Sequence, residues 1–277
     1  MKVLFVSSGN SYSKVSPIIK SQAESLIRNE VHIENYTIKE KGVKGYLKNI
    51  FLLRKFLKDK YFDVVHAHYG LSAIVAALAG AKPLVASLMG SDIICGGLQL
   101  YIIKFFAKRN WVATIVKSPE MADIIGTNNV HIIPNGVDTK HFYPVNLSEA
   151  KKALGLNPEK RHLLFAADPE RQEKNFNLVI KSIERTRIRN IELLILKNIP
   201  HHIVNVYLNA SDVILLSSKW EGSPNTIKEA MACNRPIVST RVGDVEWLLG
   251  DEQGHFLSDT SVAVSYTHLT LPTNREV

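Results

Sequence analysis

The sequence predicts an α/β fold of two domains, each a doubly wound parallel sheet with helices on both faces. Short apolar runs of strand length alternate with amphipathic segments of helix length along the chain, which is the pattern of repeated strand–helix units. The 277 residues, 45% hydrophobic and 22% charged, are enough to bury two cores. Only two cysteines are present, which excludes a disulfide framework and a cysteine metal cluster and favours a reducing compartment.

We expect a cytoplasmic protein. No apolar run reaches the length needed to span a bilayer. The N-terminal run at residues 1–6 reads as a strand that leads straight into a loop, and it is too short for the apolar region of a signal peptide.

The first domain is expected over residues 1–146 and the second over residues 147–263. In the first, we expect strands at 3–6, 63–68, 83–88, 112–116 and 130–133, and helices at 17–28 and 71–80. In the second, we expect strands at 163–167, 191–196, 213–216 and 236–240, and helices at 149–154, 175–187, 201–209 and from about 225. Each strand ends in a polar or glycine-containing loop, where open α/β sheets bind ligands.

Residues 39–60 hold most of the positive charge, with eight Lys or Arg against two acids, a net +6 of the chain's +8. Tyr46, Ile50, Leu53 and Leu57 recur at helical spacing in this segment. One interpretation is a surface helix that packs this stripe on the sheet. The other is a helix over residues 44–58 that also contacts an anionic membrane, which would make the protein peripheral to the inner face of the cell membrane. A nucleic-acid partner is not expected, because no recognition motif is present.

The central motif follows the apolar strand at 213–216. Ser223 is expected to cap the next helix, with Pro224 as its first residue and the regular helix from about Asn225. The free N–H groups and the dipole of such a helix favour an anion such as a pyrophosphate. Carboxylates at Glu221 and Glu229 bracket this position and suit hydroxyl groups. This combination indicates a nucleotide-sugar site.

The stretches E-G-S-P-N-T-I-K-E-A-M (221–231) and A-C-N-R-P-I-V-S-T-R-V-G-D (232–244) resemble the retaining GT-B glycosyltransferases of the "glycosyl transferases group 1" type. The resemblance covers residues 1–260 and implies two Rossmann-like domains. It also implies that Glu229 binds the ribose hydroxyls, that Glu221 binds the sugar hydroxyls, and that transfer occurs on one face of the sugar with the departing phosphate taking the acceptor's proton. The donor-binding residues expected are Gly9, Asn135, Gly136, Gly222, Ser223, Pro224, Asn225, Thr226 and Glu229.

Two cations lie between a strand of the second domain and its next helix. Arg171 and Lys174 can clamp a diphosphate and offset charge on the leaving group. The resemblance assigns this role firmly to Lys174, which Asn175 follows, whereas the spacing to Arg171 is shorter than the family's. With Glu221 and His68, these are the expected catalytic residues.

In the first domain, the resemblance matches His68 to the second histidine of an H-x-H motif that contacts the donor sugar or the acceptor. Asp92 could bind an acceptor hydroxyl or simply cap a helix, and both alternatives stay open. Gly9 stands where the family has a glycine pair. The I-P-N-G-V-D stretch with Asn135 and Gly136 is either a hinge turn or a backbone contact to the nucleotide. No metal site and no cofactor are expected.

Residues 264–273 match ten consecutive codons of a transposase-based sequencing adapter. We therefore expect residues 264–277 to be a non-native tail and the second domain to be truncated near residue 263. A chain cut there is expected to be poorly active, because closing the active site needs the missing elements.

The sequence thus predicts transfer of a hexosyl group from a UDP- or GDP-linked sugar to a hydroxyl of a glycan or a lipid-linked acceptor. A nucleotide-sugar epimerase on the same fold is one alternative, because fold does not fix function. A non-catalytic nucleotide-sugar-binding protein is the other.

Overall fold

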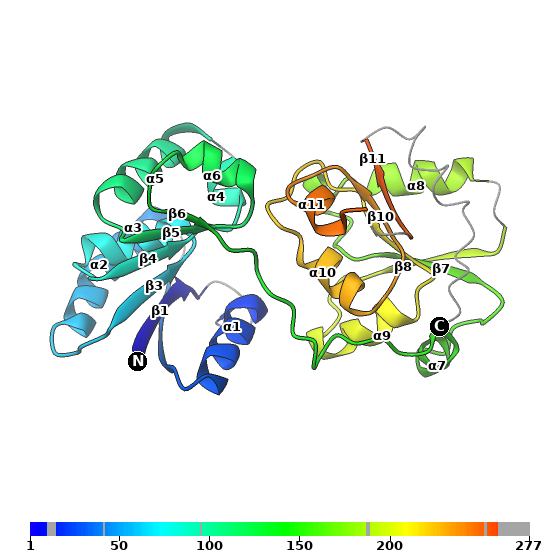
Figure 1. Ribbon diagram of the computed structural model, residues 1–277, viewed down its shortest axis with the longest axis horizontal. Helices are drawn as coiled ribbons and strands as arrows, with labels where there is room; N and C mark the ends of the chain where they lie inside the picture. The colour runs from blue at the N-terminus through cyan, green and yellow to red at the C-terminus, as the bar shows by residue number, and fades with distance from the viewer. Residues whose placement is uncertain (10–14, 41, 95, 187–188, 252–253, 260–277) are drawn as a thin grey trace. The chain divides into compact units, whose positions relative to one another are not determined.

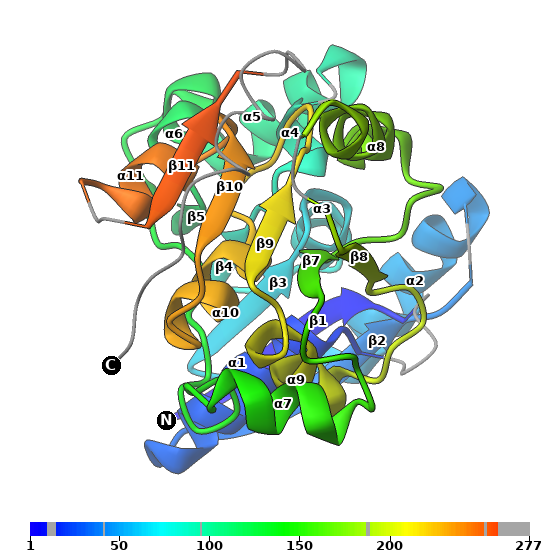
Figure 2. The same cartoon turned by 90° about the vertical axis from the view of Figure 1, so that its right-hand side faces the viewer.

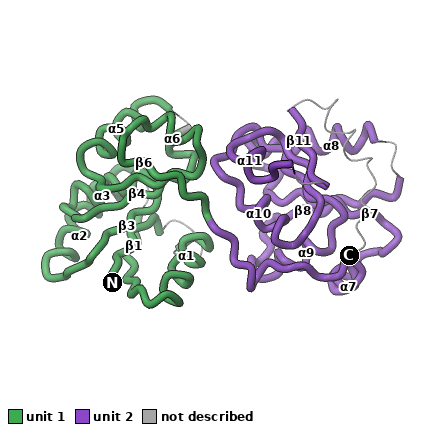
Figure 3. Tube along the Cα trace, viewed as in Figure 1, with its two compact units in different colours: residues 1–135 green, residues 136–277 purple. Residues whose placement is uncertain are grey.

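The computed structural model describes residues 1–9, 15–40, 42–94, 96–186, 189–251 and 254–259. The chain divides into two compact units, residues 1–135 and 136–277 (Figure 3). Each contains one sheet in which the strands pair in parallel. The expected α/β fold with two parallel sheets is confirmed. The expected tail at 264–277 lies outside the described residues.

Unit 1 is built on a six-stranded parallel sheet of order β2-β1-β3-β4-β5-β6. Its strands are β1 (Lys2–Ser8), β2 (His32–Ile38), β3 (Val64–His68), β4 (Leu84–Ser87), β5 (Ala113–Val116) and β6 (Val130–Ile132). Its helices are α1 (Pro17–Arg28), α2 (Gly42–Leu57), α3 (Gly70–Leu78), α4 (Ser91–Ile94), α5 (Gly97–Arg109) and α6 (Pro119–Ile125) (Figure 1).

Different helices pack on the two faces of this sheet. Helix α1 packs Ile19 against Phe5, which points to one face of β1. Side chains alternate along a strand, so Leu4 points to the other face, where it shares a core with Leu53 of α2 and Ile103 of α5. Because every crossover from β2 onward runs toward β6, right-handed connections place α2, α3, α5 and α6 together on that second face.

Helix α2 packs as the apolar stripe predicted. Leu53 is fully buried, and Tyr46, Ile50 and Leu57 are partly buried against the same core. The helix covers Gly42–Leu57. The interpretation as a helix packed on the sheet is therefore confirmed.

Unit 2 is built on a five-stranded parallel sheet of order β11-β10-β9-β7-β8, which Figure 2 shows from left to right. Its strands are β7 (Arg161–Phe165), β8 (Ile191–Ile195), β9 (Val213–Leu216), β10 (Ile237–Thr240) and β11 (His255–Ser258). Its helices are α7 (Leu147–Ala153), the 3-10 turn η1 (Gln172–Lys174), α8 (Phe176–Arg185), the 3-10 turn η2 (His201–Ile203), α9 (Val204–Asn209), α10 (Asn225–Ala232) and α11 (Val245–Leu249).

Residues 136–146, which the sequence analysis assigned to the first domain, are held by unit 2. Phe142 is buried in its core beside Leu208. The Asn209 side chain accepts from the Val145 amide at 2.8 Å and donates to the Tyr143 carbonyl at 3.0 Å. Arg235 also donates to the Val145 carbonyl. These contacts put the division of the chain before residue 147.

The sequence analysis gave no range for several of these elements, among them β2, α4, α5, α6 and β11. Strand β2 is an edge strand in which only Ile38 is fully buried, so its apolar pattern is weak. No described helix is both long and apolar enough to cross a membrane.

Candidate functional site

The loops after β7 and β9 meet at one edge of the second sheet. These strands are neighbours and run parallel, so their carboxyl ends lie side by side. The Lys174 ammonium lies 2.5 Å from Oε1 of Glu221, and each side chain is 14% exposed. The sequence predicted both residues for the site, and the structure adds that they form a direct ion pair.

One further hydrogen bond holds Glu221 within its own loop, and two more join the two loops. The Ser218 hydroxyl donates to the same Glu221 oxygen at 2.6 Å, and the Ser217 hydroxyl donates to the Lys174 carbonyl at 2.7 Å. The Lys219 amide donates to the Glu173 carbonyl at 2.8 Å. Serines 217 and 218 were not predicted as site residues. Their position directly after a buried strand was the available signal.

Helix α10 begins at Asn225, as predicted, but its cap differs from the prediction. Pro224, not Ser223, occupies the N-cap position, and its side chain makes no capping hydrogen bond. Proline has extended backbone angles there but no side-chain acceptor to offer. The first-turn N–H groups of α10 therefore lack the side-chain oxygen that Ser223 was expected to supply.

Glu229 lies on the second turn of α10 with a half-buried side chain. Burial raises its pKa to about 7, and the neighbouring Lys228 ammonium opposes this rise. No hydrogen bond reaches the Glu229 carboxylate from the described residues. Near neutral pH the protonated form of this carboxyl, which can donate a hydrogen bond, and its ionised form, which only accepts, are both populated.

The loop before α11 supports the turn that carries Glu221. Gly243 has a φ of +56°, and a Cβ built on it would lie 2.5 Å from the Gly222 carbonyl oxygen. The buried carboxyl of Asp244 lies beside the Ser223 hydroxyl and the Lys228 ammonium. Burial raises the pKa of Asp244, and these two neighbours partly offset it. The sequence analysis did not name Gly243 or Asp244 among the site residues.

Arg171 pairs with a different acid from the one that Lys174 contacts. Its side chain is 56% exposed and pairs with Oε1 of Glu173 at 2.6 Å. This neighbour contributes to the lowered pKa of Glu173, whose main cause is a backbone hydrogen bond. Arg171 thus lies on the predicted loop but at its exposed side.

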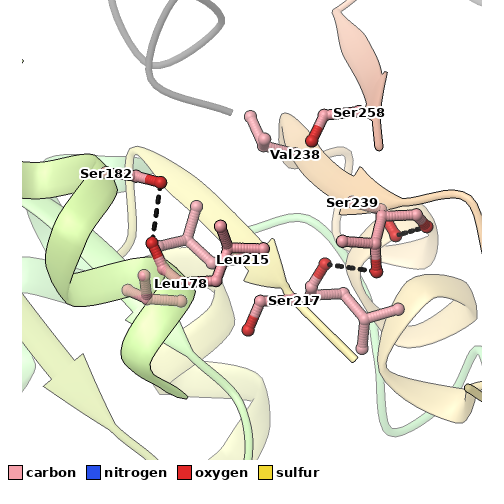
Figure 4. Close-up of a pocket in the computed structure, with 10 residues that line it drawn as sticks. Leu178, Ser182, Leu215, Ser217, Val238, Ser239 and Ser258 are labelled. Atoms are coloured by element: carbon pink, nitrogen blue, oxygen red, sulfur yellow. Dashed lines mark hydrogen bonds between the residues drawn. The ribbon is translucent and has the colours of Figure 1, made fainter. Parts of the chain in front are cut away.

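A small cavity opens beside this loop on the α8 side of the sheet (Figure 4). Its volume is about 30 Å³, which is room for a few water molecules at most. Its walls are aliphatic side chains and hydroxyls of α8, β9, β10 and β11, including Ser182, which donates to the Leu178 carbonyl at 2.7 Å. The cavity is too small for a nucleotide sugar.

His68 ends β3 in the core of unit 1 and is 1% exposed. Neither ring nitrogen has a hydrogen-bond partner among the described residues. The ring packs edge-on against Phe5 and lies 4.3 Å from the ring of His66, whose Nε2 is 2.7 Å from the Ser87 hydroxyl. Burial lowers the pKa of both histidines, that of His66 to about 4, and nearby Lys117 adds to the effect. Both rings are therefore neutral at physiological pH.

Asp92 is buried and holds two loops together. Its carboxylate accepts the amides of Gly70 at 2.9 Å, Met89 at 2.9 Å and Gly90 at 3.0 Å. Burial raises its pKa in spite of these bonds. Among the two alternatives left open, these contacts favour a capping role. They also fix the turn after His68, where Tyr69 has a φ of +81°.

The remaining predicted donor residues lie on strand-end loops. The Gly9 amide donates to the Ile38 carbonyl at 2.9 Å and so continues the β1–β2 ladder. Asn135 and Gly136 follow β6 in a segment with no turn and no regular secondary structure, and the two units divide between them. The hinge turn suggested by the Asn-Gly pair is therefore not formed there. A turn occurs at residues 139–140 instead.

Two family models match the chain. Glycosyltransferase Family 4 matches residues 15–141, and Glycosyl transferases group 1 matches residues 182–267. The chain is 26% identical over 223 residues to a protein of Bacillus subtilis named as the teichuronic acid biosynthesis glycosyltransferase TuaC, covering 71% of this chain and 57% of that one. It is 26% identical over 257 residues to the Escherichia coli UDP-Gal:alpha-D-GlcNAc-diphosphoundecaprenol alpha-1,3-galactosyltransferase, covering 76% and 66%. It therefore spans about three fifths of the length of these relatives.

Solved structures share the fold. A sucrose-phosphate synthase from Thermosynechococcus elongatus superposes with a TM-score of 0.84 at 15% identity, covering 97% of this chain and 88% of that one. Anabaena HepE in complex with UDP-glucose gives 0.71 at 16% identity, covering 98% and 89%. A UDP-GlcNAc 2-epimerase from Methanocaldococcus jannaschii gives 0.63 at 11% identity, covering 100% and 94%. The chain belongs to the GT-B glycosyltransferases, with a Family 4 region followed by a group 1 region.

Proposed function

We propose that the protein is a retaining glycosyltransferase that moves a hexosyl group from a nucleoside diphosphate sugar to a hydroxyl of a glycan or glycolipid acceptor. The observation that carries this proposal is the contact of Lys174 with Glu221 at the carboxyl edge of β7 and β9, beside the start of α10. This contact puts a cation for a diphosphate next to a carboxylate for sugar hydroxyls.

Lys174 is assigned to the diphosphate. Its ammonium has three N–H donors, and the bond to Glu221 uses one of them. The first turn of α10, with Asn225 and Thr226, would supply backbone donors and the positive end of the helix dipole. Charge that develops on the leaving phosphate is then stabilised by preorganised groups. Arg171 would reach the diphosphate only after leaving Glu173.

Glu221 is assigned to the hexosyl hydroxyls. Its Oε1 accepts from both Lys174 and Ser218, and no described residue donates to its Oε2. The bonds to Oε1 fix the orientation of the carboxylate, so Oε2 is well placed to accept a hydrogen bond from a sugar hydroxyl. Glu229, eight residues later on α10, is assigned to the ribose hydroxyls, which need its ionised form as the acceptor.

In unit 1, His68 and Asp92 are the residues assigned to substrate recognition. A neutral His68 can accept or donate one hydrogen bond to a sugar hydroxyl. Asp92 acts through the turn of residues 69–70 that it fixes, rather than by touching the acceptor.

UDP-linked sugars and lipid-linked acceptors are the first substrates to test. The E. coli relative is named for UDP-Gal and a diphosphoundecaprenol acceptor, and the HepE structure holds UDP-glucose. GDP-linked hexoses remain the alternative donors from the sequence analysis.

The test is a transfer assay with UDP-glucose, UDP-galactose and GDP-mannose, a lipid diphosphate-linked sugar as acceptor, and Glu221→Gln as the inactive comparison. We expect slow formation of a glycosylated acceptor, and NMR should show that its new bond keeps the donor's α configuration. An inverted product contradicts the retaining mechanism. Conversion of the donor to its epimer without acceptor supports the epimerase alternative, and donor binding without any turnover supports the binding-protein alternative.

A further inference from the structure

Helices α2 and α5, on one face of unit 1, carry Lys and Arg but no acid of their own. Lys48 of α2 pairs with Glu40, which lies just before the helix. Helix α2 has four Lys or Arg, α3 has none and α5 has three, and none of the three helices contains Asp or Glu. These seven cations come from a chain with a net charge of +8. Helices α2, α3 and α5 are hereafter called the basic face.

Helix α2 has a second apolar stripe, which faces solvent. Val43, Leu47 and Phe51 are spaced four residues apart, and Val43 is 75% exposed and Phe51 69% exposed. This stripe is separate from the one that packs on the sheet through Leu53. Lys44 and Lys55 are exposed beside it on the same side of the helix.

Helix α5 repeats this arrangement. Leu98, Tyr101 and Phe105 line its outer side, with Leu98 75% exposed and Tyr101 72% exposed. Lys108 and Arg109 follow in the last turn, and the Arg109 guanidinium lies 5.6 Å from the centre of the Phe105 ring.

The two exposed stripes lie on helices that flank the same third helix. Helix α3 contacts both α2 and α5, and Figure 1 shows it between them. It has no charged residue, and its Leu78 is exposed. The Arg54 side chain of α2 donates to the Leu78 carbonyl at 2.7 Å. Because Arg54 lies three residues after Phe51 and seven after Leu47, the exposed stripe of α2 is on the side of α3.

We propose that the basic face docks on an anionic phospholipid bilayer, with Val43, Leu47 and Phe51 of α2 and Leu98, Tyr101 and Phe105 of α5 entering the headgroup region. Large exposed apolar patches mark interaction sites. The absence of any acid on the three helices matches a uniformly negative surface, which attracts basic groups and repels acidic ones. Interfacial helices combine aliphatic and aromatic side chains with flanking Lys and Arg in this way.

This surface extends the membrane contact expected for residues 44–58 to three helices, and it does not depend on the proposed transfer reaction. The lipid contact and the donor site use different residues, so either can fail in experiment without the other.

The experiment is flotation of the full chain with vesicles of phosphatidylcholine alone and of an equimolar phosphatidylcholine–phosphatidylglycerol mixture. We expect binding to the anionic vesicles only, weakened by added salt. The double variant Phe51→Asp and Tyr101→Asp should lower the partition coefficient by about tenfold or more, because it removes two inserted side chains and adds two negative charges. The triple variant Lys44→Gln, Lys55→Gln and Lys108→Gln should give a loss of similar size, about tenfold or more.

Trp247→Asp provides the matched control. Trp247 is an exposed aromatic residue of α11 in unit 2, so its replacement should leave vesicle binding unchanged. The altered side chains are exposed, and thermal unfolding should show that every variant is folded.

Equal binding of the wild type and the double variant contradicts the proposal, as does equal binding to neutral and anionic vesicles. Absence of vesicle binding together with a dimer in light scattering that the double variant dissociates would instead assign the basic face to self-association.

Discussion

At the residue scale, the centre of the account is an ion pair shielded from solvent. Lys174 and Glu221 are each 14% exposed. Removing one partner of such a pair leaves the other charge desolvated, which costs more than the pair itself contributes. Two charged side chains that lie mostly buried at the end of two strands fit a role in ligand binding.

We predict that Lys174→Met lowers the free energy of unfolding by about 2 kcal/mol, because the Glu221 carboxylate is left unpaired. Lys160→Met is the matched control. Lys160 pairs with Glu192 at 3.0 Å, and both side chains are well exposed, so its loss should cost less than about 1 kcal/mol. Urea unfolding followed by circular dichroism measures both. Equal effects would show that the Lys174 pair is solvated.

We predict that Glu229 makes stability depend on pH. Its pKa is about 7 in the folded protein against an ordinary value of 4.5. Between these values the folded state holds a proton that the unfolded state has lost, so stability rises as the pH falls from 7 toward 4.5. Glu229→Gln should remove this part of the slope in urea unfolding, whereas Glu246→Gln, at an exposed position of α11, should not. Parallel slopes in all three proteins would contradict the raised pKa.

The sequence predicted the identity of these residues better than their contacts. Glu221, Glu229 and Lys174 were singled out because they flank strand ends and match a family motif. The ion pair could not be predicted, because it needs β7 and β9 to be neighbours although a strand and two helices separate them in the sequence. The Ser218 hydroxyl bond is local instead, because Ser218 lies three residues before Glu221.

At the element scale, the turn before α10, which carries Glu221 and Gly222, is supported by the loop before α11. Gly243 approaches Gly222 so closely that no side chain fits between them. The backbone that carries Glu221 is thus supported from β10, the strand next to β9.

We predict that Gly243→Ala weakens donor binding and destabilises the fold more than Gly155→Ala. Both glycines have positive φ, +56° and +65°, so both alanines incur a backbone cost of about 1–2 kcal/mol. Only at Gly243 would the new Cβ also strike the Gly222 carbonyl, whereas nothing lies within 4 Å at Gly155. Thermal melts with and without nucleotide sugar measure both effects. Identical behaviour of the two variants would exclude the supporting role.

Element types were predictable where periodicity was strong. The strand at 213–216 and the start of α10 at Asn225 are confirmed. The cap was misassigned because serine is the better capping residue in isolation, whereas the Ser223 side chain lies beside Asp244 instead. Strand β2 was missed because an edge strand needs little apolar alternation.

At the scale of the whole molecule, two compact units follow from four hydrophobic clusters, two within each unit. The fold class was predictable from the alternation of strands and helices. The division between Asn135 and Gly136 was not, because it depends on contacts that Phe142 and Val145 make with residues far along the chain.

We predict that a fragment starting at Gly136 is more stable than one starting at Leu147. The shorter fragment loses Phe142, which is 3% exposed, and loss of a buried phenylalanine costs about 3 kcal/mol or more. It also leaves the Asn209 side chain without its Val145 and Tyr143 partners. Chemical denaturation of the two fragments makes the comparison. Equal stability would place the boundary at residue 147 after all.

The central claim is a donor site formed by Lys174, Glu221 and Glu229, and a thermal-shift titration with UDP-glucose, UDP-galactose and GDP-mannose tests it most directly. Ligand at a hundredfold over its dissociation constant should stabilise the chain by about 2.7 kcal/mol. We expect this shift for donors of one base, its loss in Lys174→Met and Glu229→Ala, and its retention in Glu246→Ala. Cooperative unfolding without a shift for any donor, or an equal shift in the site variants, would contradict the account.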